Sequence, residues 1–219
     1  MASAAPRVVV TAGPTREHID DVRYVSNAST GRMGWELARE AKRRGAQVTL
    51  VLGPAELPPL PGVTVVSVIS TRDLLVATRK AVRGADLVVF AAAPADWRPA
   101  VRVRGKIKKD GRGRARVLRL VENPDVAATL GRTKGRRVHV GFALEVRDGL
   151  RHARGKLARK RLDAIVLNGP QNLGAGGGDA CWIVDGAEPL PIPTGDKRAT
   201  ARAILDQAFA LLGRRALTR

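Results

Sequence analysis

The stretch MGWELAREAKRRGAQVTLVL (residues 33–52) decides the fold class. Apolar residues over positions 33–44 have the spacing of an amphipathic helix, Gly45 is a typical helix stop, and positions 47–52 form an apolar run rich in β-branched residues. Another such run, RVVVTA, occupies positions 7–12. A strand, a helix and a strand in this order predict a β-α-β unit with parallel strands.

The alternation of strands and helices continues along the chain. We expect further strands at residues 63–69, 86–92, 117–121, 137–143, 164–168 and 180–184, further helices over 71–82, 149–162 and 196–212, and a brief helix that Pro124 begins. Ser70 or Thr71 would cap the helix over 71–82. The sequence therefore predicts a Rossmann-like, doubly wound α/β fold: one domain over residues 1–219, with a mainly parallel sheet and helices on both faces. Ligands of such sheets bind at the carboxyl ends of the strands, where the loops after Ala12 and Ala93 lie.

The composition restricts the class of protein. Of the 219 residues, 44% are hydrophobic, which is enough for one sizeable core. No apolar run approaches the roughly 20 residues of a membrane span, and the first ten residues lack the features of a signal peptide. The single cysteine, Cys181, excludes an internal disulfide. We therefore expect a soluble, cytoplasmic protein that does not bind membranes.

The formal charge of +19 favours anionic ligands: nucleic acid, a membrane surface or phosphorylated small molecules. Aromatic residues make up only 3% of the chain, and no zinc-finger spacing or RNA-binding aromatic signature occurs. Because platforms for stacked bases are scarce, nucleic acid is a less favoured partner.

A loop of small and hydroxyl-bearing residues, YVSNASTGRMG (24–34), precedes the first helix. A helix that opens near Gly31 presents backbone N–H groups and the positive end of its dipole, and the Ser29 and Thr30 hydroxyls add donors, so an anion is the natural ligand. A plain Ser/Thr helix cap is the alternative interpretation. The dinucleotide fingerprint G-x-G-x-x-G does not follow the first strand, and G-x-x-x-x-G-K-[ST] is absent from the sequence.

The segment RPAVRVRGKIKKDGRGRAR (98–116) is basic, contains glycines and lacks apolar periodicity. We expect either a mobile flap that phosphates order or a permanent β-hairpin in a dimer interface. The alternation of Val101, Val103 and Val117 fits the hairpin.

Six motifs occur in a characteristic order: TAGPTREHIDDVRYVSNASTGRMG, AAAPADWRP, KIKK, NPD, GFALE and KLARKRLDAIVLN. With them, the chain resembles phosphopantothenate–cysteine ligase, the second enzyme of the bacterial coenzyme A pathway, over about residues 7–185. The resemblance implies that CTP activates the carboxylate of 4′-phosphopantothenate as an acyl-cytidylate, that the amine of L-cysteine then displaces CMP, and that Mg²⁺ accompanies the triphosphate. It also implies a homodimer. In many bacteria this ligase is fused behind a flavin-dependent decarboxylase, whereas this chain starts at the ligase strand, so we expect neither a decarboxylase domain nor a flavin.

The resemblance implies catalytic roles for Asn27, Arg23 and Lys106. Asn27 would donate its amide to the carbonyl oxygen that gains charge when the amine attacks, and an asparagine that merely tolerates a turn is the alternative. Arg23 would neutralise a phosphate or a carboxylate. Lys106 would bind the triphosphate from a flexible segment, and a solvated charge run is the alternative there.

The resemblance also implies a set of nucleotide-binding residues: Gly13, Ser29, Thr30, Gly31, Phe90, Ala91, Ala92, Asp96, Lys106, Asn123, Pro124, Asp125, Val126, Phe142, Lys156 and Lys160. Of these, residues 29–31 would hold a phosphate of either the substrate or the nucleotide. Asp96 would accept from the cytosine amino group or a ribose hydroxyl, or would cap a turn, and Phe142 would contact the base or ribose, or would pack in the core. Lys156 and Lys160, four positions apart on one helix, would reach one polyphosphate. No metal ligands are assigned, and the choice between CTP and ATP stays open.

The glycine-rich stretch NGPQNLGAGGGDACW (168–182) departs from the family pattern, which has an aspartate after the asparagine and, later, a serine–aspartate–aspartate–asparagine run. The departure affects positions where the family pattern implies contacts to cysteine or nucleotide.

Two other functions compete with the ligase. One is a nucleotide- or NAD(P)-binding Rossmann-like protein without ligase activity, and the other is a basic nucleic-acid-binding protein whose affinity falls steeply with salt.

Overall fold

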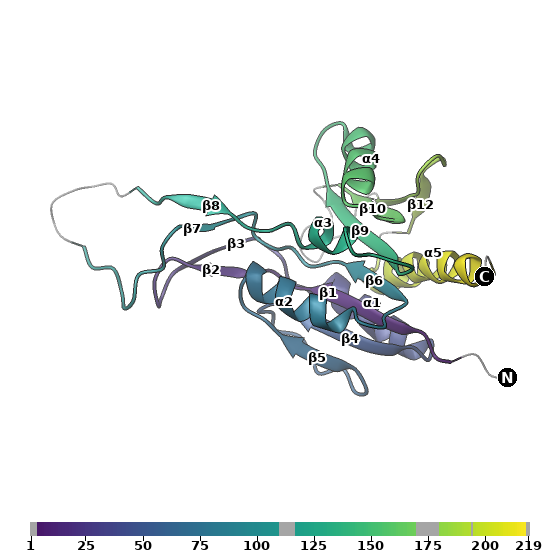
Figure 1. Ribbon diagram of the computed structural model, residues 1–219, viewed down its shortest axis with the longest axis horizontal. Coiled ribbons are helices and arrows are strands. Elements are labelled where there is room, and N and C mark those ends of the chain that lie inside the picture. The colour runs from purple at the N-terminus through teal and green to yellow at the C-terminus, as the bar shows by residue number, and fades with distance from the viewer. Residues whose placement is uncertain (1–3, 110–116, 170–179, 194, 218–219) are drawn as a thin grey trace.

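One eight-stranded sheet forms the centre of the molecule in the computed structural model, which describes residues 4–109, 117–169, 180–193 and 195–217 (Figure 1). In order across the sheet, its strands are Leu190–Ile192 (β12), Ala180–Ile183 (β11), Ala164–Asn168 (β10), Val138–Leu144 (β9), Leu87–Phe90 (β6), Arg7–Ala12 (β1), Gln47–Leu52 (β4) and Thr64–Ser67 (β5).

The six neighbouring strands from β10 to β5 are all parallel. Counted along the chain from β1, and read from β5 to β10, their order is 3-2-1-4-5-6, which is the Rossmann order. β11 and β12 extend the sheet with antiparallel pairings. The predicted fold class is confirmed, and the order reverses between β1 and β6, where such sheets bind their ligands.

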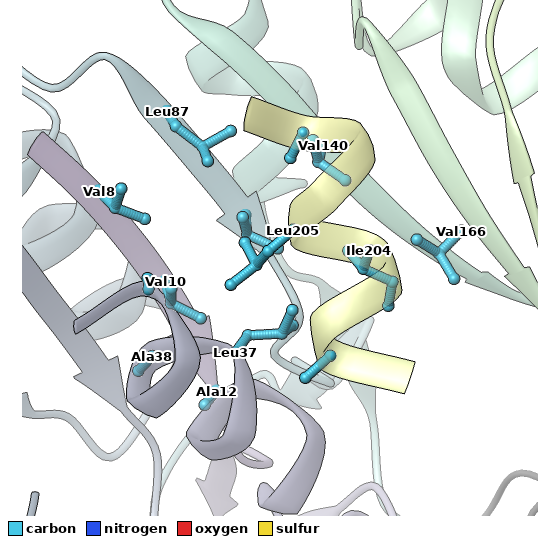
Figure 2. Packing of buried hydrophobic residues seen from close by; sticks show 14 of the residues in the cluster. Val8, Val10, Ala12, Leu37, Ala38, Leu87, Val140, Val166, Ile204 and Leu205 are labelled. Atoms are coloured by element: carbon cyan, nitrogen blue, oxygen red, sulfur yellow. The ribbon is translucent and has the colours of Figure 1, made fainter. Parts of the chain in front are cut away.

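Helices cover both faces of the sheet (Figure 1). They span Arg32–Arg43 (α1), Thr71–Ala81 (α2), Val126–Gly131 (α3), Gly149–Arg159 (α4) and Lys197–Leu217 (α5). Because successive strand residues point to opposite faces, each strand supplies two cores. Val10 packs with Leu37 of α1 and Leu205 of α5, as Figure 2 shows, whereas Val9 packs with Leu74 of α2 in the core that α3 and α4 also cover. None of the helices in the described part of the chain is long and apolar enough to cross a membrane.

Local signals explain most helix boundaries. Ser70 caps α2 as predicted, because its hydroxyl accepts from the Asp73 N–H while the Asp73 carboxylate accepts from the Ser70 N–H. The prediction that Pro124 begins a helix was two residues early: α3 begins at Val126, and Asp125 caps it by accepting from the Ala128 N–H.

Three other boundaries differ from the sequence-based expectation. α4 ends at Arg159 because Arg161 adopts a left-handed conformation, with φ 53°. α5 continues to Leu217, five residues beyond the expected end at 212. The short strand expected at 117–121 is β8, Leu120–Glu122.

An arm projects from the main sheet (Figure 1). It consists of residues 16–26 and of residues 97–109 with 117–122, and its strands are Arg16–His18 (β2), Tyr24–Ser26 (β3), Trp97–Pro99 (β7) and Leu120–Glu122 (β8). β2 pairs with β3, and β7 pairs with β8, both antiparallel. The beginning of the basic segment 98–116 is therefore paired with residues 120–122, which lie beyond the end of that segment. Residues 110–116 lie outside the described residues, and the mobility of the flap stays a prediction.

Candidate functional site

Two cavities lie at the carboxyl ends of the parallel strands. The first cavity has a volume of 570 Å³ and is lined by residues 27–34, 91–94 and 142–144 with Lys156, Asn168, Lys197 and Thr200. The second cavity has a volume of 470 Å³ and is lined by residues 94–97 and 122–127 with Thr11, Thr71, Leu74, Phe90, Ala92, Gly141, Phe142, Lys160 and Leu162. Ala92, Pro94 and Phe142 line both cavities, so the two meet at the ends of β6 and β9.

The helices that contribute most to each cavity lie on different faces of the sheet. The first cavity contains the beginnings of α1 and α5 together with Lys156 of α4, whereas the second contains residues from the beginnings of α2 and α3. A ligand that occupies both cavities, or two ligands that meet between them, would therefore cross the edge of the sheet at the point where the strand order reverses.

The beginning of α1 is built to approach an anion. Its first flanking residue is Gly31 in a left-handed conformation (φ 72°), so no side chain caps the helix from that position. The Ser29 hydroxyl accepts only a 3.3 Å bond from the Gly31 N–H, and the Thr30 hydroxyl only a 3.4 Å bond from the Arg32 N–H. The hydroxyls of the loop therefore bind N–H groups at the helix start only weakly, and the loop and the first residues of α1 line the first cavity.

Three cations and no carboxylate are among the described residues that line the first cavity. Arg32 pairs with Glu36 at 2.8 Å, and Lys156 pairs with Glu145 at 2.6 Å. Burial would raise the pKa of Glu145, but Lys156 and His152 outweigh burial and lower it. The Glu145 carboxylate is therefore stabilised in its ionised form beside the Lys156 side chain.

Asn27 lies in the first cavity, next to the region shared with the second. Its side-chain Nδ2 donates to the backbone oxygen of Pro94 at 2.9 Å and, more weakly, to that of Ala93 at 3.4 Å. These bonds fix the amide at the place where the two cavities meet, with its donor group turned toward the end of β6.

The second cavity has the opposite balance of charge, since among the described residues Asp96, Glu122 and Asp125 line it with one cation, Lys160. Lys160 pairs with Asp125 at 2.8 Å. Burial would raise the pKa of Asp125, but the Ala128 N–H and Lys160 outweigh it and lower the pKa. The Asn123 side chain donates to the Ala95 backbone oxygen at 2.9 Å, which orders the loop that carries Asp96.

The structure divides the sequence-predicted residues between the two cavities. Those that line the first are Asn27, Ser29, Thr30, Gly31, Ala91, Ala92, Phe142 and Lys156. Those that line the second are Phe90, Ala92, Asp96, Asn123, Pro124, Asp125, Val126, Phe142 and Lys160. Lys156 and Lys160 thus line different cavities, because Lys160 is the residue that ends α4 and turns toward Asp125. Gly13 lines neither, and it packs its Cα under Gly31.

Arg23 and Lys106 lie on the arm and line neither cavity. The Arg23 guanidinium binds the Asp20 carboxylate and the Ile107 backbone oxygen. Asp20 is fully buried and also accepts from the N–H groups of Val22, Arg23 and Ile107. Arg23, opposed by burial, is the main cause that holds the pKa of Asp20 well below its usual range. Asp20 therefore ties the β2–β3 hairpin to the segment that carries Lys106.

Among the residues of the first cavity that sequence reasoning did not assign to the site are Asn168, Lys197 and Thr200. Asn168 ends β10, so the rule that ligands bind at the carboxyl ends of parallel strands could have found it. Lys197 and Thr200 lie in the first turn of α5, and no sequence motif marks them. Most of the atypical glycine-rich stretch, residues 170–179, lies outside the described residues.

The family described as "DNA/pantothenate metabolism flavoprotein C-terminal domain" matches residues 4–211. The chain belongs to this family. The match covers nearly the whole chain and includes both cavities and the arm.

Individual relatives agree with the family in sequence and in fold. A coenzyme A biosynthesis bifunctional protein CoaBC from Vibrio cholerae is 39% identical over 201 residues, which cover 89% of this chain and 50% of the relative. A protein named cysteine/cysteine sulfinic acid decarboxylase, from an unknown prokaryotic organism, is 46% identical over 174 residues, which cover 78% of this chain and 48% of the relative. The chain spans about half the length of these relatives.

Solved structures match the fold over nearly all of their length. The crystal structure of the C-terminal domain of a CoaBC protein has a TM-score of 0.82 and 34% identity, and the match covers 95% of this chain and 96% of that domain. A Cab2 mutant H337A in complex with phosphopantothenate-cysteine has the same fold at 14% identity, with a TM-score of 0.76 over 97% of this chain and 88% of that one.

Proposed function

We propose that this protein is a phosphopantothenate–cysteine ligase of coenzyme A biosynthesis that uses CTP and acts in the cytoplasm. The observation that carries the proposal is the pair of cavities that meet beside Asn27, one of them lined by three cations. The C-terminal domain of the CoaBC protein, which this chain matches from end to end, supports the assignment. The complex of the more distant Cab2 mutant names phosphopantothenate-cysteine as the ligand of the same fold.

The residues that the resemblance assigns to the nucleotide line both cavities, so we place CTP across the point where the cavities meet. Asp96, Asn123 and Lys160 line the second cavity, and Lys156 lines the first. Arg32, Lys156 and Lys197, with the backbone donors at the beginning of α1, make the first cavity suited to phosphate groups, either of CTP or of 4′-phosphopantothenate. The role of Asp96 as an acceptor for cytosine or ribose remains a further proposal, and it requires the nucleotide to reach past Pro94.

The reaction follows from bringing the two ligands together where the cavities meet. A carboxylate oxygen of 4′-phosphopantothenate attacks the α-phosphorus of CTP, the O–P bond to the β-phosphate breaks, and pyrophosphate leaves with the electron pair. The cysteine amine then attacks the acyl carbon, and CMP leaves. Asn27 donates its amide to the acyl oxygen as that oxygen gains negative charge, which lowers the barrier of the second step.

Mg²⁺ enters this proposal only as part of the nucleotide substrate. No group of three or more His, Cys, Asp or Glu side chains that could hold a metal ion occurs in the described part of the chain. Mg²⁺ usually binds through substrate phosphates with one or two carboxylates, so the ion would arrive with the nucleotide and would not occupy a site built by the protein alone. No step of the reaction is assigned to the ion.

A homodimer is part of the same proposal. The arm exposes apolar side chains, among them Val101, 73% exposed, and Val117, 94% exposed. An extended element of this kind gains stability by packing on a second copy. The arm also carries Arg23 and Lys106, which reach neither cavity of their own chain. Packing of the arm on a partner would bring these two residues toward the partner's site.

The experiment is an assay of pyrophosphate release with CTP and ATP side by side. The ligase requires CTP and 4′-phosphopantothenate together, and cysteine yields 4′-phosphopantothenoylcysteine and CMP. Tight binding of NADPH without pyrophosphate release would instead favour a nucleotide-binding protein of the same fold that lacks ligase activity.

A further inference from the structure

Two buried hydroxyls, those of Thr15 and Thr71, lie between the loop after β1 and the beginning of α2. Both residues are only 1% exposed, and their Oγ1 atoms are 2.9 Å apart. The Thr15 hydroxyl accepts from the Ala95 N–H at 2.9 Å, and the Thr71 hydroxyl donates to the Ala95 backbone oxygen at 3.2 Å. The two hydroxyls therefore bind one residue of the loop after β6.

The chemistry of a hydroxyl fixes the direction of the bond between the two threonines. A hydroxyl has a single hydrogen to donate. Because Thr71 uses its hydrogen on the Ala95 oxygen, Thr15 must donate to Thr71. The result is a closed hydrogen-bond ring, which runs from the Ala95 N–H through the Thr15 and Thr71 hydroxyls to the Ala95 oxygen. Buried bonds of this kind strengthen one another, and breaking one leaves a buried polar group without a partner.

The elements around the ring do not need its hydroxyls. Ser70 caps α2, and the Thr71 N–H donates to the buried Glu17 carboxylate at 2.8 Å, so the beginning of α2 is satisfied without the Thr71 hydroxyl. Thr15 lies between β1 and β2 and belongs to neither strand. The two hydroxyls therefore serve the loop after β6.

This ring is connected to Asn27 through one peptide group. The Pro94 carbonyl and the Ala95 N–H belong to the same planar unit, in which they point in opposite directions. Asn27 Nδ2 donates to that Pro94 oxygen at 2.9 Å. Thr15 thus holds one side of the peptide plane, and Asn27 is bound to the other. Nδ2 carries two hydrogens, so the bond to Pro94 uses one and sets the direction of the other.

We propose that Thr15, oriented by Thr71, is a positioning residue that holds the Pro94–Ala95 peptide so that Asn27 points toward the acyl oxygen. This inference rests on the proposed ligase function and adds to it a residue that does not touch the reacting atoms. Without the ring the peptide can rotate, and Asn27 donates in a poorer direction when the cysteine amine attacks and the acyl oxygen gains charge. Formation of acyl-cytidylate does not use the Asn27 amide and is less affected.

The test compares Thr15→Val and Thr15→Ser with the matched control Thr78→Val. Valine keeps the shape of threonine without the hydroxyl, whereas serine keeps the ring. Thr78 is fully buried in α2, donates its hydroxyl to the Leu74 backbone oxygen and lines neither cavity. Rapid-quench assays follow the formation of acyl-cytidylate and its conversion by cysteine as separate steps. Hydrogen exchange, read by NMR, follows the Ala95 amide in the protein without ligands.

We expect Thr15→Val to slow the conversion by cysteine about 10- to 100-fold, the effect of a misplaced donor, and to form acyl-cytidylate at close to the wild-type rate. The Ala95 amide exchanges faster in this variant. Thr15→Ser and Thr78→Val convert acyl-cytidylate as wild type does. In Asn27→Ala, which has already lost the donor, Thr15→Val causes little further slowing, because both changes act through one group.

Three results would overturn the inference. They are an equal slowing in Thr78→Val, a slowing by Thr15→Val that persists in full in Asn27→Ala, and undiminished conversion in Thr15→Val although its Ala95 amide exchanges faster. Unchanged exchange of the Ala95 amide in Thr15→Val would contradict the ring itself, whatever the enzyme does. A wild-type protein that forms no acyl-cytidylate would instead contradict the proposed function, and the exchange rates would still report on the ring.

Discussion

Replacing Gly34 by alanine tests whether the close packing of α1 on β1 positions the phosphate-facing loop. A Cβ atom on Gly34 would lie 2.4 Å from the Ala12 Cβ atom and 3.0 Å from the Thr11 backbone oxygen. Carbon atoms in contact are about 3.5–4.0 Å apart, so α1 would have to move away from β1 by roughly 1 Å. Both contacts belong to a central strand that cannot yield, and the beginning of α1 would move with its cavity-lining residues.

The stability change can be estimated from two opposing effects. Overpacking of a core costs about 1–3 kcal/mol, and a 2.4 Å contact belongs at the upper end of that range. Alanine is better than glycine in a helix by at most about 1 kcal/mol. The net loss is about 2 kcal/mol, which lowers the melting temperature of a chain of this size by about 4–8 °C. We also expect a higher KM for CTP, because the backbone donors at residues 29–31 shift.

Gly155→Ala is the matched control. Gly155 lies in the exposed part of α4, and nothing lies within 4 Å of the Cβ position. This substitution should stabilise the protein by about 0.5–1 kcal/mol and leave the KM for CTP unchanged. Urea unfolding and CTP saturation curves measure both variants. If Gly34→Ala is as stable as Gly155→Ala, or if it retains the wild-type KM for CTP, the close approach of α1 does not position the loop.

Three further substitutions probe the site and the core. Asn27→Asp should leave formation of acyl-cytidylate largely intact but slow its conversion by cysteine about 100-fold or more, as rapid-quench assays would show, because a carboxylate replaces the donor beside the developing oxyanion. Lys160→Gln should raise the CTP concentration needed for half-saturation and cost under about 1 kcal/mol in urea unfolding at pH 7. Since the pKa of Asp125 is below its ordinary value of 3.8, the stability that Asp125 gains from Lys160 is present above that value and is lost as the pH falls through the lower folded pKa. Burial lowers the pKa of His139 from 6.5 to about 3, so between pH 6.5 and pH 4 the unfolded wild-type chain takes up a proton that the folded chain does not. The free energy of unfolding of the wild type therefore falls by up to about 1.4 kcal/mol per pH unit as the pH is lowered. His139→Leu should flatten this pH dependence, measured by urea unfolding.

Each of these expectations can fail separately. Undiminished turnover of Asn27→Asp with cysteine would remove Asn27 from the mechanism. A melting temperature that drops by many degrees with unchanged CTP saturation would make Lys160 a structural residue. An identical pH profile for His139→Leu and wild type would mean that another group causes the loss of stability in acid.

The sequence predicts the central sheet well because its strands are long, apolar and buried. The expected bounds of β1, β4 and β10 agree with the structure at both ends, since a parallel strand covered on both faces reads as a continuous β-branched run. The strands β2, β3, β7 and β12 were missed. Each has three residues, and β2, β3 and β7 lie on the arm, outside the main sheet, so neither period nor burial marks them.

The candidate site was predictable where a motif follows a strand. Asn27 and the predicted residues near the ends of β6 and β9 line the cavities, because the carboxyl ends of parallel strands meet at one edge of the sheet. The division of the residues into two cavities was not predictable, since it depends on tertiary packing. Lys156 pairs with Glu145 whereas Lys160, which follows α4, pairs with Asp125, and Lys197 reaches the first cavity through the packing of α5, which the local sequence does not specify.

The most direct test of the ligase proposal is a single reaction with purified protein, CTP, Mg²⁺, 4′-phosphopantothenate and L-cysteine, followed by mass spectrometry and a pyrophosphate assay. We expect pyrophosphate release that depends on 4′-phosphopantothenate, and 4′-phosphopantothenoylcysteine and CMP in equal amounts when cysteine is present. In the absence of cysteine, an acyl-cytidylate should accumulate to no more than the concentration of sites. No pyrophosphate and no coupled product with either CTP or ATP, from a folded protein that binds the nucleotide, would contradict the proposal.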